Sequence, residues 1–199
     1  MGGGTRVADV GRVGHTRWMR RAILFVLVVV LVAVSCSESP PTSTPAATAS
    51  STEGGIMQLS SPDFEPEGSI PARFTCDGDD ESPELNLAGI PEGTVSLVLI
   101  MDDPDASVGT FDHWVAFDME PTEVIPCNVG DLGTGGANSW KRLGYGGPCP
   151  PSGTHRYFFK VLALDTALDL EEGATKDEVL AAADGHVLGD ATLMGTYQR

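Results

Sequence analysis

The chain has 199 residues, enough for one domain of ordinary size and too few for two. Glycine (24 residues) and proline (14) are abundant, which favours short strands and many turns over long helices. From residue 36 onward there are 7 basic and 27 acidic side chains, a net charge of −20. Such a surface repels phosphate backbones and argues against a nucleic-acid partner.

Residues 1–35 have the parts of an export signal. Two arginines precede a run of thirteen apolar residues (22–34), and small residues follow. The run is shorter than the roughly 20 residues that span a bilayer as a helix. The position of Cys36 resembles a bacterial lipoprotein cleavage site, so we expect Cys36 to be acylated and to anchor the protein on the outer face of the cell membrane. Plain secretion or a retained anchor are the alternatives, and Met19 looks a better start than Met1.

Residues 36–55 are rich in Ser, Thr, Pro and Ala and have no apolar periodicity. This composition cannot bury enough surface to offset the entropy of ordering it, so we expect a disordered tether. The folded domain is expected to be residues 56–199.

Within that domain, short strand-like runs alternate with turn signals. The expected strands are Ser69–Cys76, Val95–Met101, Phe111–Met119, His155–Leu164 and Ala191–Tyr197. The second is apolar throughout and is expected to be central. One helix is expected at Lys176–Ala183, opened by a capping box of Thr175 and Glu178. Strands dominate, so the pattern predicts an all-β fold with a β-sandwich architecture.

Polar side chains lie at the ends of three of these elements. Asp103 and Asp105 follow the central strand, and a Gly- and Pro-rich loop (146–154) leads into His155. Period-2 alternation predicts two single faces, one with Phe111, His113, Val115, Phe117 and Met119, the other with His155, Tyr157, Phe159 and Val161. If these strand ends meet, two imidazoles, a phenol and a carboxylate converge on one mouth.

Four segments carry a specific resemblance: DDPDA (102–106), FDHWVAFDM (111–119), YGGPCPPSGTHRYFFKVLALD (145–165) and GHVLGDATLMGTYQR (185–199). Together they resemble the bacterial branch of the phosphatidylethanolamine-binding, Raf-kinase-inhibitor-like family, over residues 56–199. The resemblance implies a Greek-key β-sandwich with one or two short peripheral helices. It also implies a small cavity that accepts phosphate-like anions and phospholipid head groups, with no cofactor.

The resemblance assigns ligand-binding positions residue by residue. They are Asp103, Asp105, His113, Gly147, His155 and Tyr157. Ser107 stands where the family usually has proline, which removes one backbone restraint from that loop. Kinase inhibition is not transferred on this resemblance.

Such a constellation is chemically suited to an anion. Imidazole supplies N–H donors, and a neighbouring carboxylate fixes its tautomer and raises its pKa. Asp103 and the acidic surface oppose an anion, so we expect weak binding. Protonated His113 and His155 should improve it at mildly acid pH.

Three cysteines remain in the domain, an odd number in a compartment that permits disulfides. The segments FTCDG and GPCPP look familiar together in relatives, which implies a pair between Cys76 and Cys149. A bond between Cys127 and Cys149 is the alternative.

Three functions follow. The first is a non-enzymatic binding or regulatory module for a phosphate-like anion, a phospholipid head group or an anionic group of a partner. The second is a metal-dependent hydrolase, because Asp103, His113 and His155 have the types of a two-His, one-carboxylate site, although the chain has no GxSxG or HExxH motif. The third is an inhibitor or interaction protein that acts through surface loops, above all Glu120–Gly144.

Overall fold

The computed structural model describes residues 56–130 and 132–199. The expected export signal, the acylated Cys36 and the tether therefore lie outside the described residues. The elements are β1 (Gln58–Ser60), the 3-10 turn η1 (Ala72–Phe74), β2 (Leu85–Ala88), β3 (Ser96–Asp103), β4 (Phe111–Met119), β5 (Val124–Ile125), β6 (Thr134–Gly135), β7 (Thr154–Leu164), α1 (Lys176–Ala183) and β8 (Val187–Gln198). In this part of the chain, no helix is long and apolar enough to cross a membrane.

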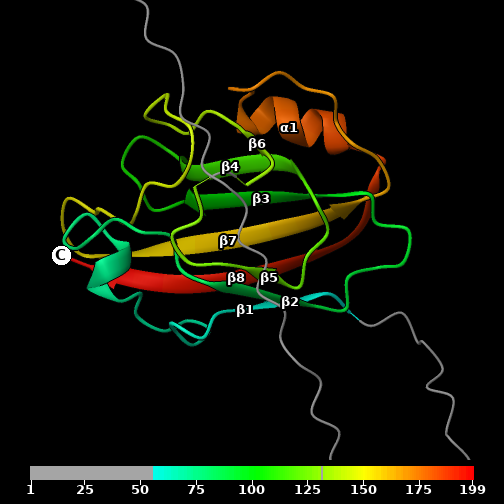
Figure 1. The fold of residues 1–199 in the computed structure, drawn as a ribbon. Coiled ribbons are helices and arrows are strands. Elements are labelled where there is room, and N and C mark those ends of the chain that lie inside the picture. The colour runs from blue at the N-terminus through cyan, green and yellow to red at the C-terminus, as the bar shows by residue number, and fades with distance from the viewer. Residues whose placement is uncertain (1–55, 131) are drawn as a thin grey trace, which may run out of the picture. The chain divides into compact units, whose positions relative to one another are not determined.

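Two antiparallel sheets share one apolar core. The larger sheet has the order β6-β4-β3-β7-β8, and the smaller has the order β1-β2-β5 (Figure 1). Side chains from both sheets, among them Leu59, Leu85, Leu99 and Phe159, form the core between them. Every residue of β3 is buried, as expected for the strand at the centre of the larger sheet. The prediction of a mostly β domain with few helices is confirmed.

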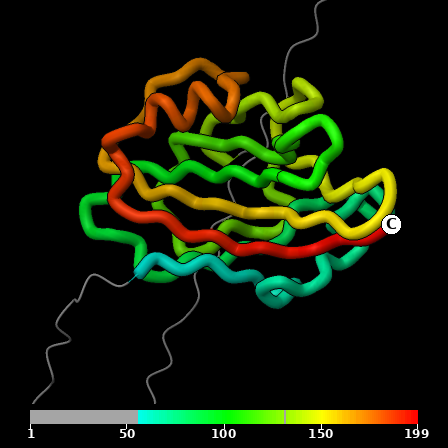
Figure 2. The backbone as a smooth tube through the Cα atoms, turned by 180° about the vertical axis from the view of Figure 1, so that it is seen from behind, coloured from blue at the N-terminus to red at the C-terminus, as the bar shows by residue number. Residues whose placement is uncertain are grey.

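The other face of the larger sheet packs against α1. Val179 and Ala183 of the helix join Val98 and Ile100 of β3 in a second, smaller apolar cluster. The helix begins with the expected capping box: the Glu178 N–H donates to the Thr175 hydroxyl, and the Glu178 carboxylate accepts from the Thr175 N–H at 2.8 Å. Figure 2 shows this helical segment on one side of the strands and the β1 segment on the other.

The predicted single face of β4 is wrong, because two irregularities break its alternation. Met101 and Asp102 are consecutive residues of β3, and they pair with Trp114 and Asp112 of β4. His113, which lies between Asp112 and Trp114, is therefore the extra residue of a β-bulge. Trp114 lies in the core between the sheets, and the ring of His113 packs on an aromatic side chain of the same core. The bulge thus aims two consecutive side chains, His113 and Trp114, to the same side.

A second irregularity follows near the end of β4. Asp118 has a positive φ of 51°, and the pairing with β3 shifts at this point. As a result, Val115 and Phe117 pack in the cluster under α1, whereas Met119 lies in the core between the sheets. A strict period of two could not predict either bulge.

The predicted strand at residues 69–76 is also wrong over most of its length. Only its first residue pairs, as an isolated parallel bridge from Ser69 to Thr196 of β8. The chain then turns into η1, after Pro71, which cannot donate to a sheet ladder. This departure places η1 and the loop after it against the cavity loop described below.

Candidate functional site

A cavity of about 290 Å³ lies at one end of the larger sheet. Because β4, β3 and β7 are antiparallel neighbours, the end of β3 meets the starts of β4 and β7. This geometry brings together Asp103 from β3, His113 from β4, and His155 and Tyr157 from β7. The convergence of these four side chains at one mouth is therefore present in the structure.

Asp103 and His155 form a buried pair. The Nδ1 of His155 lies 2.7 Å from Oδ2 of Asp103, and their side chains are 11% and 4% exposed, respectively. The other carboxylate oxygen of Asp103 accepts the N–H of Asp105 at 2.8 Å, which fixes the loop after β3. Since a carboxylate accepts the Nδ1 proton, the second ring nitrogen of His155, Nε2, is left for the cavity that the ring lines.

His113 is held by a different kind of partner. Its Nδ1 lies 2.7 Å from the carbonyl oxygen of Gly146, which can only accept, so Nδ1 carries the proton. The rings of Phe111, Trp140 and Tyr157 surround His113, with centroids 5.4, 5.0 and 5.2 Å from its own. This burial lowers the pKa of His113 and outweighs the nearby carbonyl and the charge of Asp103. The carboxylate of Asp103 does raise the pKa of His113, as expected, but the expected net rise is wrong because burial outweighs it.

Tyr157 has a buried hydroxyl without a partner. Its side chain is inaccessible, and the hydroxyl makes no well-aligned hydrogen bond within the described chain, although the backbone of Cys149 lies close enough to oppose the pKa rise described next. Burial, together with the negative charge of Asp103, raises the pKa of Tyr157. The phenol thus keeps its proton and remains a potential hydrogen-bond donor, and Tyr157 is one of the residues that line the cavity.

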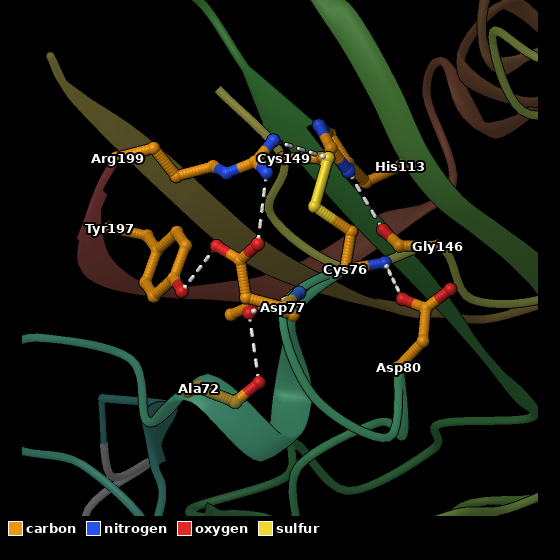
Figure 3. The surroundings of a disulfide bond; sticks show 11 residues. Ala72, Cys76, Asp77, Asp80, His113, Gly146, Cys149, Tyr197 and Arg199 are labelled. Atoms are coloured by element: carbon orange, nitrogen blue, oxygen red, sulfur yellow. Dashed lines mark hydrogen bonds and ion pairs between the residues drawn. A yellow bond between two sulfur atoms is a disulfide. The ribbon is translucent and has the colours of Figure 1, made fainter. Parts of the chain in front are cut away.

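A disulfide fixes the loop before β7, which forms one wall of the cavity. Cys76 and Cys149 are bonded with their Cα atoms 5.5 Å apart, and Cys149 lines the cavity. Figure 3 shows this bond beside Asp77, whose carboxylate accepts from the hydroxyl of Tyr197 and pairs with the guanidinium of Arg199. The pairing implied by the resemblance is confirmed. The alternative with Cys127 is wrong, because that thiol is exposed and unbonded in the described chain.

Gly147 supports this wall from behind. Its N–H donates to Oδ1 of Asp80 at 2.7 Å, and an added Cβ would lie 2.4 Å from the carbonyl oxygen of Phe74. Only glycine allows so close an approach of the two loops. Gly147 is absent from the cavity lining, so the structure places it in the support of the loop.

Asp105 also lies outside the cavity lining. Its two carboxylate oxygens accept from the Arg156 side chain at 2.7 and 2.9 Å, and one of them also accepts the Arg156 N–H. Hydrogen bonding to Arg156 lowers the pKa of Asp105 to about 2. The predicted site is thus divided: four residues converge, while Asp105 and Gly147 brace the loops.

Sequence reasoning missed most of the apolar lining. Trp140, Phe111, Val108, Pro150 and Pro151 complete the cavity wall. Trp140 belongs to the loop 120–144, in which only a partner surface was anticipated. A large aromatic residue in a Gly-rich polar loop was the available signal, because such side chains rarely stay in water without a packing role.

Asn138 holds Trp140 in place. Its side-chain oxygen accepts the N–H groups of Trp140 and Arg142 at 3.0 and 3.1 Å, and its side-chain nitrogen donates to the carbonyl of Gly144. Ser139 ties the same loop to β4 through the backbone of Asp112. The indole is therefore a fixed wall of the cavity.

The cluster does not fit the metal site considered above. Across residues 56–130 and 132–199, no three His, Cys, Asp or Glu side chains lie close enough together to share an ion. Nδ1 of each cavity histidine is already used by Asp103 or Gly146. The donor geometry consequently gives no support to the hydrolase interpretation.

These features define a class: a small, mostly β domain with a cavity of two histidines, a carboxylate and a phenol at one end of its larger sheet. The family model described as "Phosphatidylethanolamine-binding protein" matches residues 60–198. The chain belongs to the phosphatidylethanolamine-binding protein family, as the resemblance predicted.

Relatives and solved structures agree with this assignment. A UPF0098 protein of Methanothermobacter thermautotrophicus is 50% identical over 150 residues, 72% of this chain and 99% of that protein. A UPF0098 protein of Aquifex aeolicus is 45% identical over 159 residues, 75% of this chain and 92% of that protein.

Two crystal structures are similar in fold. A putative phosphatidylethanolamine-binding protein homologue from Chlamydia trachomatis has a TM-score of 0.70 and 39% identity, covering 72% of this chain and 98% of its own. YbcL of E. coli, described as a new member of the mammalian PEBP family, has a TM-score of 0.68 and 26% identity. The match covers 73% of this chain and 99% of YbcL.

Proposed function

We propose that this domain is a non-enzymatic binding or regulatory module whose cavity takes a phosphate-like group, free or as part of a phospholipid head group. The unpartnered hydroxyl of Tyr157 carries the proposal, because a buried polar group without a partner is costly unless a ligand supplies one.

The rest of the cavity suits the same guest. The Nε2 atoms of His113 and His155 are the ring positions left over after their Nδ1 atoms are bound. Fixed rings and a disulfide-secured loop hold these groups in place before a ligand arrives, which lowers the entropic cost of binding. Asp103 opposes the charge of an anion, so the affinity is expected to be weak.

The proposal has a structural and a cellular part. The two sheets around one core support the Greek-key β-sandwich that the family resemblance implies. The sequence of residues 1–36 supports export and acylation of Cys36, which would hold the cavity near the outer face of the membrane, where phospholipid head groups and protein partners are available. Incorporation of a labelled fatty acid into the wild type and into Cys36→Ser tests the anchor; equal labelling would contradict it.

Calorimetric titration with phosphoethanolamine tests the binding function. We expect saturable binding to the wild type and at least about a tenfold loss in His155→Ala, because a donor and the partner of Asp103 are removed together. His186→Ala is the matched control, since His186 forms an exposed hydrogen bond with Asp165 and is absent from the cavity lining. Undiminished binding in His155→Ala would refute the proposed site.

A further inference from the structure

The cavity has an unusual balance of charge for a phosphate site. Its lining, all within the described residues, includes the carboxylate of Asp103 but no lysine or arginine. The arginines beside lining residues are engaged with other groups: Arg156 pairs with Asp105, and Arg142 lies over the ring of Trp140, 5.1 Å from its centroid. Arg199 reaches Sγ of Cys149 at 3.5 Å, but its guanidinium pairs with the carboxylate of Asp77. A doubly charged anion would meet a carboxylate without a permanent cation to offset it.

His113 adds a second constraint, which concerns hydrogen bonding. Its Nδ1 proton is committed to the carbonyl of Gly146. In the neutral ring the other nitrogen, Nε2, can therefore only accept a hydrogen bond. Figure 3 shows this second nitrogen pointing away from Gly146. Packing among Phe111, Trp140 and Tyr157 disfavours a charged ring.

The lining without a lysine or arginine disfavours a doubly charged ligand, and the accepting Nε2 of His113 favours a ligand that can donate a proton. We infer that the cavity selects a singly charged phosphate that keeps one P–OH group, with that group donating to Nε2 of His113 and the Tyr157 hydroxyl donating to another phosphate oxygen. This inference rests on the proposed function and narrows it to phosphate monoesters and inorganic phosphate. Sulfate and phosphodiesters have no such proton at neutral pH, so they leave Nε2 of His113 unpaired. An intact phospholipid carries its head group as a phosphodiester, so we expect it to bind more weakly than a phosphomonoester.

The pH dependence of the affinity comes from titration of the ligand as well as from titration of the protein. A phosphomonoester loses its second proton with a pKa of about 6, so the P–OH form is depleted as the pH rises above that value. The ionisable groups around His113 are Asp103 on β3, Asp112 on β4, and His155 and Tyr157 on β7. A loss of affinity with rising pH does not by itself separate titration of the protein from titration of the ligand. A comparison of ligands at one pH does.

The decisive pair is methyl phosphate and dimethyl phosphate at pH 5.5. Dimethyl phosphate is singly charged and methyl phosphate mainly so at this pH, and the two monoanions differ only in P–OH against P–OCH₃. Titration of the wild-type protein should show methyl phosphate binding at least about tenfold more tightly, the usual effect of leaving a buried acceptor unpaired. Phosphoethanolamine should exceed glycerophosphoethanolamine, the diester of a lipid head group, by a similar factor, and inorganic phosphate should exceed sulfate.

Three outcomes are distinguishable. Preference for the monoesters supports the inference. Equal or stronger binding of the diesters overturns it while leaving the proposed anion site standing. No binding of any of the six ligands removes the proposed function and, with it, the inference.

A spectroscopic readout on the wild-type protein is independent of any variant. The ³¹P shift of phosphoethanolamine, followed through a pH titration, reports the protonation of the phosphate. We expect the bound ligand to have a higher second pKa than the free ligand, and an unchanged or lower value overturns the inference. As a matched variant, His113→Gln offers an amide that can donate, so the ratio between methyl and dimethyl phosphate should fall toward one. A ratio that stays as in the wild type also counts against the inference.

Discussion

Asp103 and His155 lie 52 residues apart in the chain, yet a 2.7 Å hydrogen bond between carboxylate and ring joins them in the lining of the cavity. The domain holds a second pair of the same chemistry, His186 with Asp165 at 2.8 Å, in which both side chains are about half exposed. Burial is thus the main difference between the two pairs, and this makes them a natural comparison.

Removing the carboxylate from each pair should have unequal effects on stability. Asp103→Ala leaves a buried imidazole without a partner and should lower the free energy of unfolding by about 1–3 kcal/mol. Asp165→Ala should change it by less than about 0.5 kcal/mol, because water replaces a partner lost at an exposed site. Urea denaturation at pH 7 measures both, and equal losses would contradict the structural role assigned to the buried pair.

Tyr157 and Tyr145 provide a second matched comparison. The hydroxyl of Tyr157 has no partner in the described chain, whereas that of Tyr145 donates to the carbonyl of Phe74 at 2.6 Å. Tyr157→Phe should therefore leave the free energy of unfolding unchanged or raise it, while weakening phosphoethanolamine binding about tenfold. Tyr145→Phe should lower the free energy of unfolding by about 1 kcal/mol.

Denaturation measures the stability of the two variants, and calorimetry measures the affinity of Tyr157→Phe for phosphoethanolamine. A clear loss of stability in Tyr157→Phe would show that its hydroxyl serves the fold. Unchanged ligand affinity in that variant would remove the phenol from the site.

The disulfide is expected to stabilise both the fold and the cavity. Cys76 and Cys149 are 73 residues apart, and the bond fixes the loop that carries the cavity wall. The double variant Cys76→Ser/Cys149→Ser should lower the free energy of unfolding by about 2–4 kcal/mol and weaken phosphoethanolamine binding. Cys127→Ser, which changes an exposed thiol, is the control and should alter neither. Wild-type ligand affinity in the double variant would show that the cavity loop holds its place without the bond.

Asp105 should contribute to acid stability and leave ligand binding unaffected. Its pKa in the folded protein is about 2, against an ordinary value of 3.8, so the folded state favours the charged form. The resulting stabilisation is fully present above about pH 4 and is lost as the pH falls toward 2. Asp105→Asn should therefore destabilise the protein at pH 6, with a difference from the wild type that disappears near pH 2.

Thermal unfolding across this pH range measures the first effect, and titration with phosphoethanolamine at pH 6 measures the second. A large loss of affinity in Asp105→Asn would restore this residue to the binding site, from which its contacts with Arg156 separate it.

Local sequence signals predicted the longer elements well, but they missed the short strands β1, β2, β5 and β6. The limits of α1 and its capping box, the all-buried β3, and the alternating β7 follow from composition and periodicity over short windows. The bulge at His113 could not be predicted in this way, because it depends on how β4 pairs with β3. That bulge turns His113 toward the cavity, so a feature hidden from the sequence is essential to the site.

The site was predicted at the level of residue types and less well at the level of roles. Asp103, His113, His155 and Tyr157 converge as expected, because antiparallel neighbours bring alternate strand ends together. The charge state of His113 depends on burial by rings from distant segments, among them Trp140, which no local pattern reveals. Loop bracing by Gly147 and Asp105 likewise became visible only with their tertiary partners.

The most direct test of the anion cavity is an NMR titration of the labelled wild-type protein with phosphoethanolamine, observed on the histidine ring nitrogens and the tryptophan indoles. We predict saturable shifts at Nε2 of His113 and His155 and at the indole of Trp140, with His186 and Trp114 unmoved. Shifts that fail to saturate, or that spread over the surface and spare these three residues, would contradict it.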